Sequence, residues 1–317
     1  MPDTRKILIT DEVHPLLPEG LEQMGFEVHY RPKIKPEEVL ENINRYEGLV
    51  INSKVYVGQE MIDRAGLLKF VCRAGSGLEV IDLEYAKLKN IYAFNSPEGN
   101  RNAVAEFALG ALLNMMRNVG KCNNEVKNRA WKREENRGDE LLGKTVGLIA
   151  FGNTGQAFAK LLAGFDVQVL AYDKYYHGFS AGHVKEATIE EIAEQADVLS
   201  LHLPLTAETR FMIDYNFLSQ FKKPYRLVNT SRGKVLDSAA LLRCIEEGKI
   251  MSAALDVLEN EKINELNGEE QGVFDQLIGE GRIFLSPHIA GWTHESKRKI
   301  AEVLLSRIQK IYQAPLL

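Results

Sequence analysis

The chain has 317 residues, of which 45% are hydrophobic and 26% are charged, and its net charge is −5. This length allows two domains that each bury a core, and the composition is that of a globular protein. The negative charge argues against a general binder of nucleic acids or anionic membranes. We find no signal peptide and no apolar run long enough to cross a bilayer, so we expect a cytoplasmic protein. The three cysteines, Cys72, Cys122 and Cys244, lie far apart in the sequence, which fits a reducing compartment and predicts neither disulfides nor a metal site.

The first part of the chain alternates short apolar runs with helical segments. The strand candidates are residues 6–10, 26–30, 48–52, 69–73 and 91–95. Residues 36–46 and 57–66 fit helices by their apolar spacing and by the acids in their first turns. This alternation predicts a parallel sheet covered by helices on both faces.

A long apolar helical pattern at residues 102–118 follows a predicted turn at 96–100 and leads into a second alternation. The strand candidates of this second series are residues 145–150, 167–172, 197–203, 225–230, 251–257 and 282–286. Residues 294–312 fit an amphipathic helix with no strand after it, so we expect this helix to return to the first domain.

The predicted fold class is therefore α/β, with two doubly wound parallel-sheet domains and a cleft between them. A flavodoxin-like substrate domain would be discontinuous, comprising residues 1–98 and 292–317. A Rossmann-type cofactor domain would comprise residues 99–291.

Residues 145–162, TVGLIAFGNTGQAFAKLL, predict a strand, a glycine turn and an amphipathic helix. Gly152 would let the backbone approach a pyrophosphate closely, and Gly155 would let the helix pack tightly on the strand. Free N–H groups at the start of that helix would bind the phosphates. Ala150 stands where G-x-G-x-x-G has its first glycine, so we expect this position to avoid positive φ.

Asp173 ends the next apolar run and has the spacing of the acidic residue that binds the ribose hydroxyls in dinucleotide-binding folds. A carboxylate there would repel a 2′-phosphate, so we expect NAD rather than NADP as the cofactor. The alternative is a surface aspartate that only ends a strand. The neighbouring Lys174 could weaken the discrimination.

Three later segments place reactive side chains just after apolar strands, and such positions meet at the carboxyl edge of a parallel sheet. They present Arg232, the pair Glu259 and Glu261, and His288. A guanidinium can bind a carboxylate and polarise the adjacent carbonyl, and an imidazole is suited to acid–base work near neutral pH. A carboxylate beside the imidazole would fix the ring and favour its protonated form. Each residue alone is more often structural, but an arginine, a carboxylate and a histidine together indicate reversible oxidation of a 2-hydroxy acid.

With these residues the sequence resembles the D-isomer-specific 2-hydroxyacid dehydrogenase family, most closely its D-3-phosphoglycerate dehydrogenase-like branch. The resemblance covers nearly the whole chain, from GLVINS to SPHIAGWT. It places the catalytic arginine at Arg232, within a match to N-x-x-R-G-x-x-x-D. It places the catalytic glutamate at Glu261, five residues after Asp256, with Glu259 as the alternative. The match to P-H-I-A-G gives His288 as the acid/base.

The resemblance also implies which residues bind cofactor and substrate. The implied cofactor-binding residues, besides Gly152 and Gly155, are Asn153, Thr154, Asp173, Pro204, Thr230 and Asp256. Asp256 would face the nicotinamide carboxamide. The backbone N–H groups of Ser76 and Gly77 would bind the substrate carboxylate, with Ser53 in the same site.

Two departures from the family pattern concern the site. Lys262 replaces a proline that often follows the catalytic glutamate, and Asn52 stands where phosphoglycerate-type relatives usually carry arginine. Loss of that cation affects phosphate recognition, although Lys54 or Arg73 could substitute. Since the chain ends at residue 317, we expect no C-terminal regulatory domain and no serine feedback through one.

The sequence therefore predicts an NAD-dependent oxidoreductase for 2-hydroxy acids, with D-3-phosphoglycerate of serine biosynthesis as the leading substrate. One alternative is a reductase of hydroxypyruvate, glyoxylate or another short 2-oxoacid. An alternative from another class is an NAD-sensing protein-interaction module, against which Arg232, Glu261 and His288 argue. We expect a homodimer in which the apolar helix 102–118 buries one face against the second subunit. The other reading is that this helix packs only within its own chain.

Overall fold

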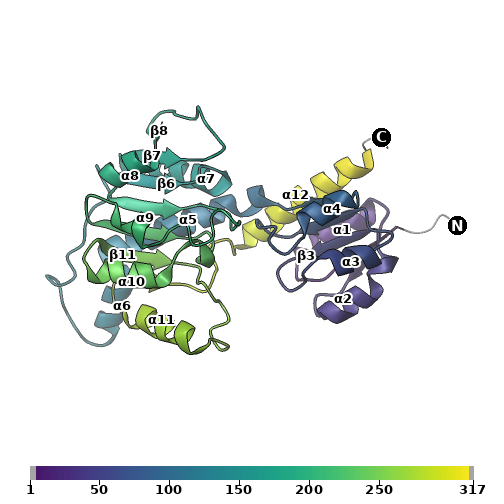
Figure 1. The fold of residues 1–317 in the computed structure, drawn as a ribbon, viewed down its shortest axis with the longest axis horizontal. Coiled ribbons are helices and arrows are strands. Elements are labelled where there is room, and N and C mark those ends of the chain that lie inside the picture. Colours follow the sequence, from purple (N-terminus) through teal and green to yellow (C-terminus); the bar gives the residue numbers. More distant parts are fainter. Residues whose placement is uncertain (1–4, 314–317) are drawn as a thin grey trace. The chain divides into compact units, whose positions relative to one another are not determined.

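The computed structural model describes residues 5–313 of the chain. Contacts divide the chain into two compact units. The first unit is made of residues 1–101 and 292–317, and the second is residues 102–291. Each unit is built on its own parallel sheet, five-stranded in the first and seven-stranded in the second, so the predicted α/β fold class with two sheets is confirmed (Figure 1).

The sheet of the first unit has the strand order β2-β1-β3-β4-β5, which is the flavodoxin-like order. All neighbouring strands pair in parallel. Its strands are β1 (Lys6–Ile9), β2 (Glu27–Tyr30), β3 (Gly48–Ile51), β4 (Phe70–Arg73) and β5 (Tyr92–Phe94). Its helices are α1 (Leu16–Gln23), α2 (Pro36–Asn42), α3 (Gln59–Arg64), α4 (Leu83–Leu88) and α12 (His294–Gln313), with a 3-10 turn at Ile43–Arg45.

Alternation along β1 divides the core of the first unit between the two faces of the sheet. Ile7 and Ile9 pack with α1 and α12, whereas Leu8 packs with α2, α3 and α4. The C-terminal helix α12 lies beside α1 and buries Leu304 and Ile308 against the first strands (Figure 1). Cys72 is fully buried in β4.

The sheet of the second unit has the strand order β12-β11-β10-β9-β6-β7-β8. If β6 is counted as the first strand of the unit and the sheet is read from β8, the order is 3-2-1-4-5-6-7. This is the Rossmann order with one further strand, and it reverses between β6 and β9. The strands are β6 (Thr145–Ile149), β7 (Gln168–Tyr172), β8 (Val184–Glu186), β9 (Val198–Leu201), β10 (Tyr225–Asn229), β11 (Ile250–Leu255) and β12 (Ile283–Leu285). The helices that follow the first strand are α7 (Asn153–Leu162), α8 (Ile189–Gln195), α9 (Tyr215–Ser219), α10 (Ser238–Glu246) and α11 (Gly268–Gly279), with 3-10 turns at Ala163–Phe165 and Gly233–Val235.

Within residues 5–313, β8 is the one strand that the sequence did not predict. Its three residues, Val184–Glu186, carry two charged side chains, and it pairs with β7 at the edge of the sheet. A three-residue run with one apolar side chain gives no periodic signal.

Two helices lie between the two alternating series. The first, α5 (Pro97–Arg117), begins earlier than expected, because the predicted turn at 96–100 forms its first turn and Pro97 takes the start position that proline favours. Its side chains Ala105, Ala108 and Leu112 are buried in the core of the second unit, so one face of the helix packs within its own chain.

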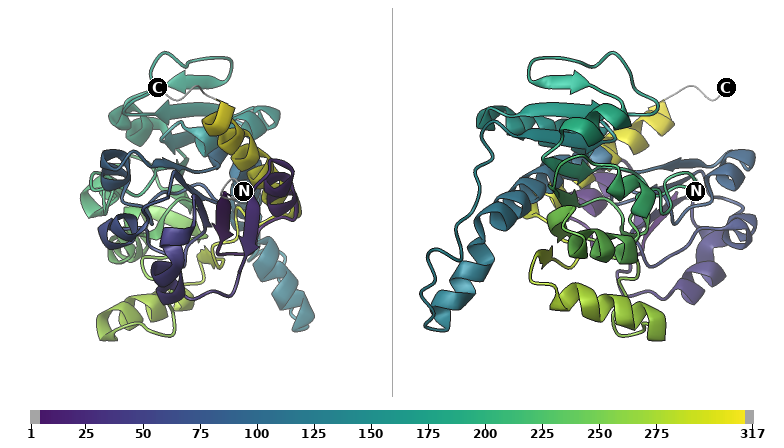
Figure 2. Two further views of the ribbon diagram at one scale, coloured as in Figure 1. Left: turned by 90° about the vertical axis from the view of Figure 1, so that its right-hand side faces the viewer. Right: turned by 60° about the vertical axis from the view of Figure 1, so that its left-hand side comes forward.

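The second of these helices, α6 (Val119–Lys127), has no buried residue and extends away from the sheet of its unit (Figure 2, right). Val119, Val126 and the nearby Trp131 are exposed. None of the helices within residues 5–313 has the length and apolar content that crossing a bilayer requires.

Candidate active site

The glycine turn between β6 and α7 follows the predicted strand–turn–helix order. A Cβ on Gly155 would lie 2.5 Å from the carbonyl oxygen of Ala150, so only glycine allows this approach of helix and strand. A Cβ on Gly152 would meet no protein atom within 4 Å. No side chain caps the N-terminus of α7, where Asn153 and Thr154 are the first residues. The chain's own packing therefore does not require Gly152, and the first N–H groups of α7 have no side-chain acceptor.

The expectation that Ala150 avoids positive φ was wrong, since its φ is +73°. The reason lies in two hydrogen bonds on either side of its Cα. The Ala150 N–H donates to the Tyr172 carbonyl at 2.8 Å, and the Phe151 N–H donates to Oδ2 of Asp173 at 2.8 Å. The turn keeps its left-handed geometry with alanine in the glycine position, at a cost of about 1–2 kcal/mol.

The carboxylate of Asp173 anchors the loop that follows β7. Besides Phe151, it accepts the N–H groups of Tyr175 and Tyr176 on Oδ1, at 2.9 and 3.0 Å. Each carboxylate oxygen has two lone-pair sites, so acceptor capacity remains on this partly exposed side chain. Lys174 is paired with Glu208 through a 2.9 Å contact.

The turn after β10 presents Arg232. The fully buried Asn229 accepts the N–H and the hydroxyl of Ser231 on its Oδ1, and its amide donates to the Arg232 carbonyl. The side chain of Asn229 thus closes the turn. Thr230 lies in the same turn, and its buried hydroxyl has no hydrogen-bond partner within the described part of the chain.

Gly233 brings the arginine turn against the loop that carries Glu261. A Cβ on Gly233 would lie 1.8 Å from the carbonyl oxygen of Leu258 and 2.6 Å from the nitrogen of Glu259. No side chain fits in that space, so glycine after Arg232 is required by the close approach of the two backbones. In the sequence this glycine stands out only as part of the N-x-x-R-G-x-x-x-D match.

Asp256 holds the loop after β12 in place. It is 2% exposed, and its carboxylate accepts the Ser286 hydroxyl at 2.5 Å and the N–H groups of Ile289 and Ala290 at 3.0 and 2.8 Å. Its carbonyl accepts the His288 N–H at 2.8 Å. His288 itself has a φ of +55°, a conformation that a non-glycine residue adopts only when its surroundings impose it.

His288 and Glu261 form a pair. Nδ1 of His288 lies 2.9 Å from Oε2 of Glu261, and the two side chains are 43% and 46% exposed. An ionised carboxylate only accepts hydrogen bonds, so the hydrogen of this bond lies on Nδ1. Nε2 is then the ring nitrogen that can exchange a proton with a ligand.

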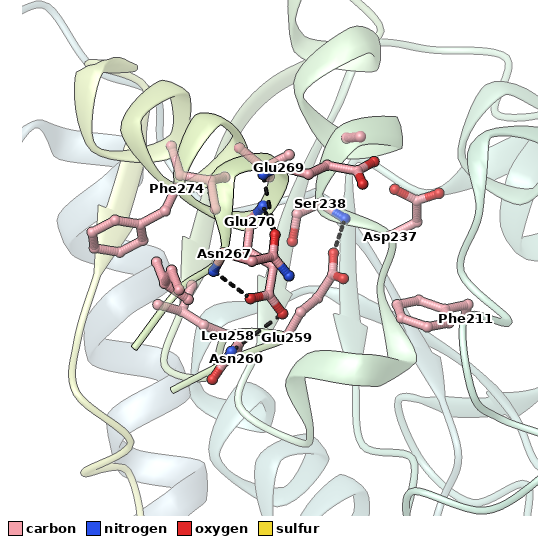
Figure 3. A pocket seen from close by; sticks show the side chains of 14 residues that line it. Phe211, Asp237, Ser238, Leu258, Glu259, Asn260, Asn267, Glu269, Glu270 and Phe274 are labelled. Atoms are coloured by element: carbon pink, nitrogen blue, oxygen red, sulfur yellow. Dashed lines mark hydrogen bonds between the residues drawn. The ribbon is translucent and has the colours of Figure 1, made fainter. Parts of the chain in front are cut away.

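Glu259 is bonded elsewhere. Its Oε1 accepts the N–H of Ser238 at 2.7 Å, at the start of α10, so this carboxylate caps a helix. Figure 3 shows Glu259 in a pocket with Phe211, Asp237 and residues of α11, and this bond to Ser238 is one of the dashed lines. Of the two glutamates that the sequence offered, Glu261 is the one in contact with the histidine.

Two residues of the segment after β9, Pro204 and His202, also bear on the site. The carbonyl of Pro204 accepts the Thr209 hydroxyl at 2.6 Å. His202 was not predicted from the sequence. It directly follows β9, the neighbour of β6 in the sheet, and lies beside the glycine turn. It is 7% exposed, its Nε2 lies 3.0 Å from the Ser200 hydroxyl, and burial lowers its pKa to about 4. The histidine in LHLPLT, directly after a strand, was the signal that could have revealed it.

The residues expected to bind substrate lie in the first unit, after β3 and β4. The hydroxyl of Ser76 donates to Oδ1 of Asn100 at 2.5 Å, and Ser53 is exposed. Gly77 follows Ser76 in the same loop.

Both cations considered as substitutes for the missing arginine have partners within the first unit. Lys54 donates to the Pro32 carbonyl at 2.7 Å, and Arg73 pairs with Glu79 at 2.9 Å.

Comparison with known proteins agrees with this arrangement. Residues 109–290 match the family model described as D-isomer specific 2-hydroxyacid dehydrogenase, NAD binding domain. The chain belongs to this family. Its resemblance in sequence is thereby confirmed, and the second unit is an NAD-binding domain.

Individual members of the 2-hydroxyacid dehydrogenase family match over most of the chain. D-3-phosphoglycerate dehydrogenase of Methanocaldococcus jannaschii is 34% identical over 98% of this chain and 58% of its own length. Hydroxypyruvate reductase of Thermotoga maritima is 32% identical over 87% of this chain and 88% of its own length. The chain thus spans little more than half the length of its phosphoglycerate dehydrogenase relatives. A crystal structure of D-lactate dehydrogenase from Aquifex aeolicus, complexed with NAD and lactic acid, has a TM-score of 0.83 at 25% identity and covers 98% of this chain and 96% of its own.

Proposed function

We propose that this protein is an NAD-dependent dehydrogenase of D-2-hydroxy acids. The observation that carries the proposal is the hydrogen bond between His288 and Glu261 inside a domain of the NAD-binding type. An imidazole held at Nδ1 by a carboxylate is the arrangement of a general acid–base group. Arg232 follows a strand of the same sheet, and its guanidinium can donate two parallel hydrogen bonds to a carboxylate.

The residues around the glycine turn fit a dinucleotide. The uncapped N–H groups of α7 suit a pyrophosphate, and Gly152 leaves room for its close approach. The buried Thr230 hydroxyl, which has no partner within residues 5–313, suits a polar group of a ligand. Asp173 would accept the ribose hydroxyls, Asn153, Thr154 and Pro204 would contact the cofactor, and Asp256 would face its carboxamide. When bound, the nicotinamide ring supplies or accepts the hydride.

The chain's own residues supply the proton and orient the acid. In reduction, protonated His288 would donate from Nε2 to the substrate's carbonyl oxygen, while Glu261 stabilises the imidazolium. Arg232 would hold the carboxylate and polarise the carbonyl. In the first unit, the N–H groups of Ser76 and Gly77, with Ser53, would bind the substrate carboxylate.

The first substrate to test is D-3-phosphoglycerate with its oxidised partner, because relatives of that name match over almost the whole chain. A second candidate is hydroxypyruvate, glyoxylate or another short 2-oxoacid. Lys54 and Arg73, the two cations that could replace the missing arginine, are already bonded to Pro32 and Glu79. This favours a substrate without a phosphate.

A panel of oxoacids assayed with NADH and NADPH separates these readings. 3-Phosphohydroxypyruvate, hydroxypyruvate, glyoxylate and pyruvate should each be compared by kcat/KM, with the His288→Gln variant as the inactive control. We expect turnover of at least one acid with NADH. A preference for the phosphorylated acid would support the phosphoglycerate reading. Binding of NADH without turnover of any acid would instead favour an NAD-sensing interaction module.

We also propose a homodimer. Because α5 buries much of its apolar face in its own unit, the exposed Val119, Val126 and Trp131 are the better candidates for a subunit interface. Sedimentation should give twice the monomer mass at micromolar concentration, and Trp131→Asp should weaken the assembly. A wild-type monomer under those conditions would refute the dimer.

A further inference from the structure

A cluster of three side chains connects the segment after β7 with the loop after β9. Nζ of Lys174 lies 2.9 Å from Oε2 of Glu208, and the hydroxyl of Tyr175 donates to the same oxygen at 2.6 Å. The Lys174 ammonium also lies 5.3 Å from the centre of the Tyr175 ring. One carboxylate oxygen therefore holds both a cation and a hydroxyl.

This cluster adjoins Asp173. Oδ1 of Asp173 accepts the N–H groups of Tyr175 and Tyr176, so the backbone that carries Lys174 and Tyr175 is fixed relative to the Asp173 carboxylate. Lys174 and Tyr175 are the two residues that directly follow Asp173 on this fixed backbone. Glu208 reaches them from a different loop, 34 residues further along the chain than Lys174.

The charges bear on the choice between two dinucleotides. NADP differs from NAD by a phosphate on the adenosine ribose, and an ammonium and a hydroxyl are groups that bind phosphate. Lys174 and Tyr175 would otherwise offer both groups beside Asp173. Glu208 occupies them and adds a negative charge that repels a phosphate.

We propose that Glu208 is a specificity-determining residue that keeps Lys174 and Tyr175 from binding the 2′-phosphate of NADP. The inference rests on the proposed binding of the dinucleotide ribose near Asp173, and it is independent of which 2-hydroxy acid is the substrate. Asp173 would repel the phosphate directly. Glu208 would act by binding the Lys174 ammonium, so that this cation is not available to the phosphate.

The experiment is a fluorescence titration of NADH and NADPH with four proteins. They are the wild type, Glu208→Gln, Glu186→Gln, and the double variant Lys174→Met with Glu208→Gln, all repeated with Asp173→Ser so that NADPH binding is strong enough to measure. Glu186→Gln is the matched control, because Glu186 is bonded to His177 and Gly178 in the segment between β7 and β8 and has the same charge.

In Glu208→Gln the Kd for NADPH should fall by about 5-fold, the size expected for one exposed charge pair, while the Kd for NADH stays nearly constant. The double variant should lose this gain, and Glu186→Gln should not show it. An equal gain in Glu186→Gln, a gain that persists without Lys174, or no gain in Glu208→Gln would each overturn the proposal. Because the readout is binding, inactivity toward every oxoacid would count against the proposed reaction and leave this result standing.

Discussion

Nδ1 of His288 lies 2.9 Å from Oε2 of Glu261, although the two residues are 27 positions apart in the sequence. Two features of the backbone bring them together. Gly233 lets the loop of Glu261 pass against the turn after β10, and Asp256 fixes the loop of His288 through its carboxylate and its carbonyl. The pair is thus held by buried contacts even though both side chains are partly exposed.

Replacing Glu261 by glutamine should slow reduction. The variant removes the negative charge beside His288, the group that delivers the proton, so kcat for reduction should fall. Glu259→Gln should leave kcat nearly unchanged, because Glu259 is bonded to the Ser238 N–H. The kcat values of the two variants test this, and a loss only in the Glu259 variant would contradict the assignment.

Replacing Asp173 by alanine should narrow the preference for NAD over NADP. The carboxylate that would bind the ribose diol and repel a 2′-phosphate is lost. The ratio of kcat/KM values with NADH and NADPH measures the change. A wild type that prefers NADPH would show that Asp173 has another role.

Replacing Ala150 by glycine should stabilise the protein. Its φ of +73° is unfavourable for alanine, and glycine would relieve about 1 kcal/mol of strain, partly offset by the greater entropy of the unfolded chain. Urea unfolding should show a higher midpoint with the same slope. Ala157→Gly, inside α7, is the matched control and should lower stability by about 0.5–1 kcal/mol. Equal losses in both variants would mean that the turn is unstrained.

His202 should make the fold sensitive to mild acid. Burial lowers the pKa of His202 from 6.5 to about 4, so the unfolded chain binds the proton first as the pH falls. The contribution of His202 to the free energy of unfolding is complete above pH 6.5. It decreases by up to about 3 kcal/mol as the pH falls toward 4.

The measurement is the free energy of unfolding as a function of pH for wild type and His202→Gln, whose amide can still bond to Ser200. The variant should lose less free energy of unfolding than the wild type between pH 6.5 and 4. Identical curves for wild type and His202→Gln would refute a buried neutral imidazole.

Much of the fold could be predicted because strong periodicity and strand composition are local properties. The apolar run 145–150 and the amphipathic helix 294–312 both appear in the structure within a residue or two of their expected bounds. The edge strand β8 could not be predicted, because its pairing with β7 gives it its structure. The conformation of Ala150 was also misjudged, since two hydrogen bonds from distant residues determine it.

The site was predictable in its residue types and less so in its contacts. The resemblance to the family favoured Glu261 over Glu259, but the distinction depends on which carboxylate reaches His288 and which caps α10. The need for glycine at position 233 is set by a backbone from another strand end, and the sequence alone does not show it. The pairing of Lys174 with Glu208 likewise joins two loops that are distant in the sequence.

The most direct test of the proposed reaction is the transfer of deuterium from NADH labelled at the reactive position of its nicotinamide ring. The protein should be incubated with this cofactor and the oxoacid that it turns over best, and the product analysed by mass spectrometry and chiral chromatography. We predict a D-2-hydroxy acid that carries the deuterium at C2, with the rate about 10²–10⁴-fold lower in His288→Gln. An unlabelled product, an L-2-hydroxy acid, or a His288→Gln variant as fast as the wild type would contradict this account.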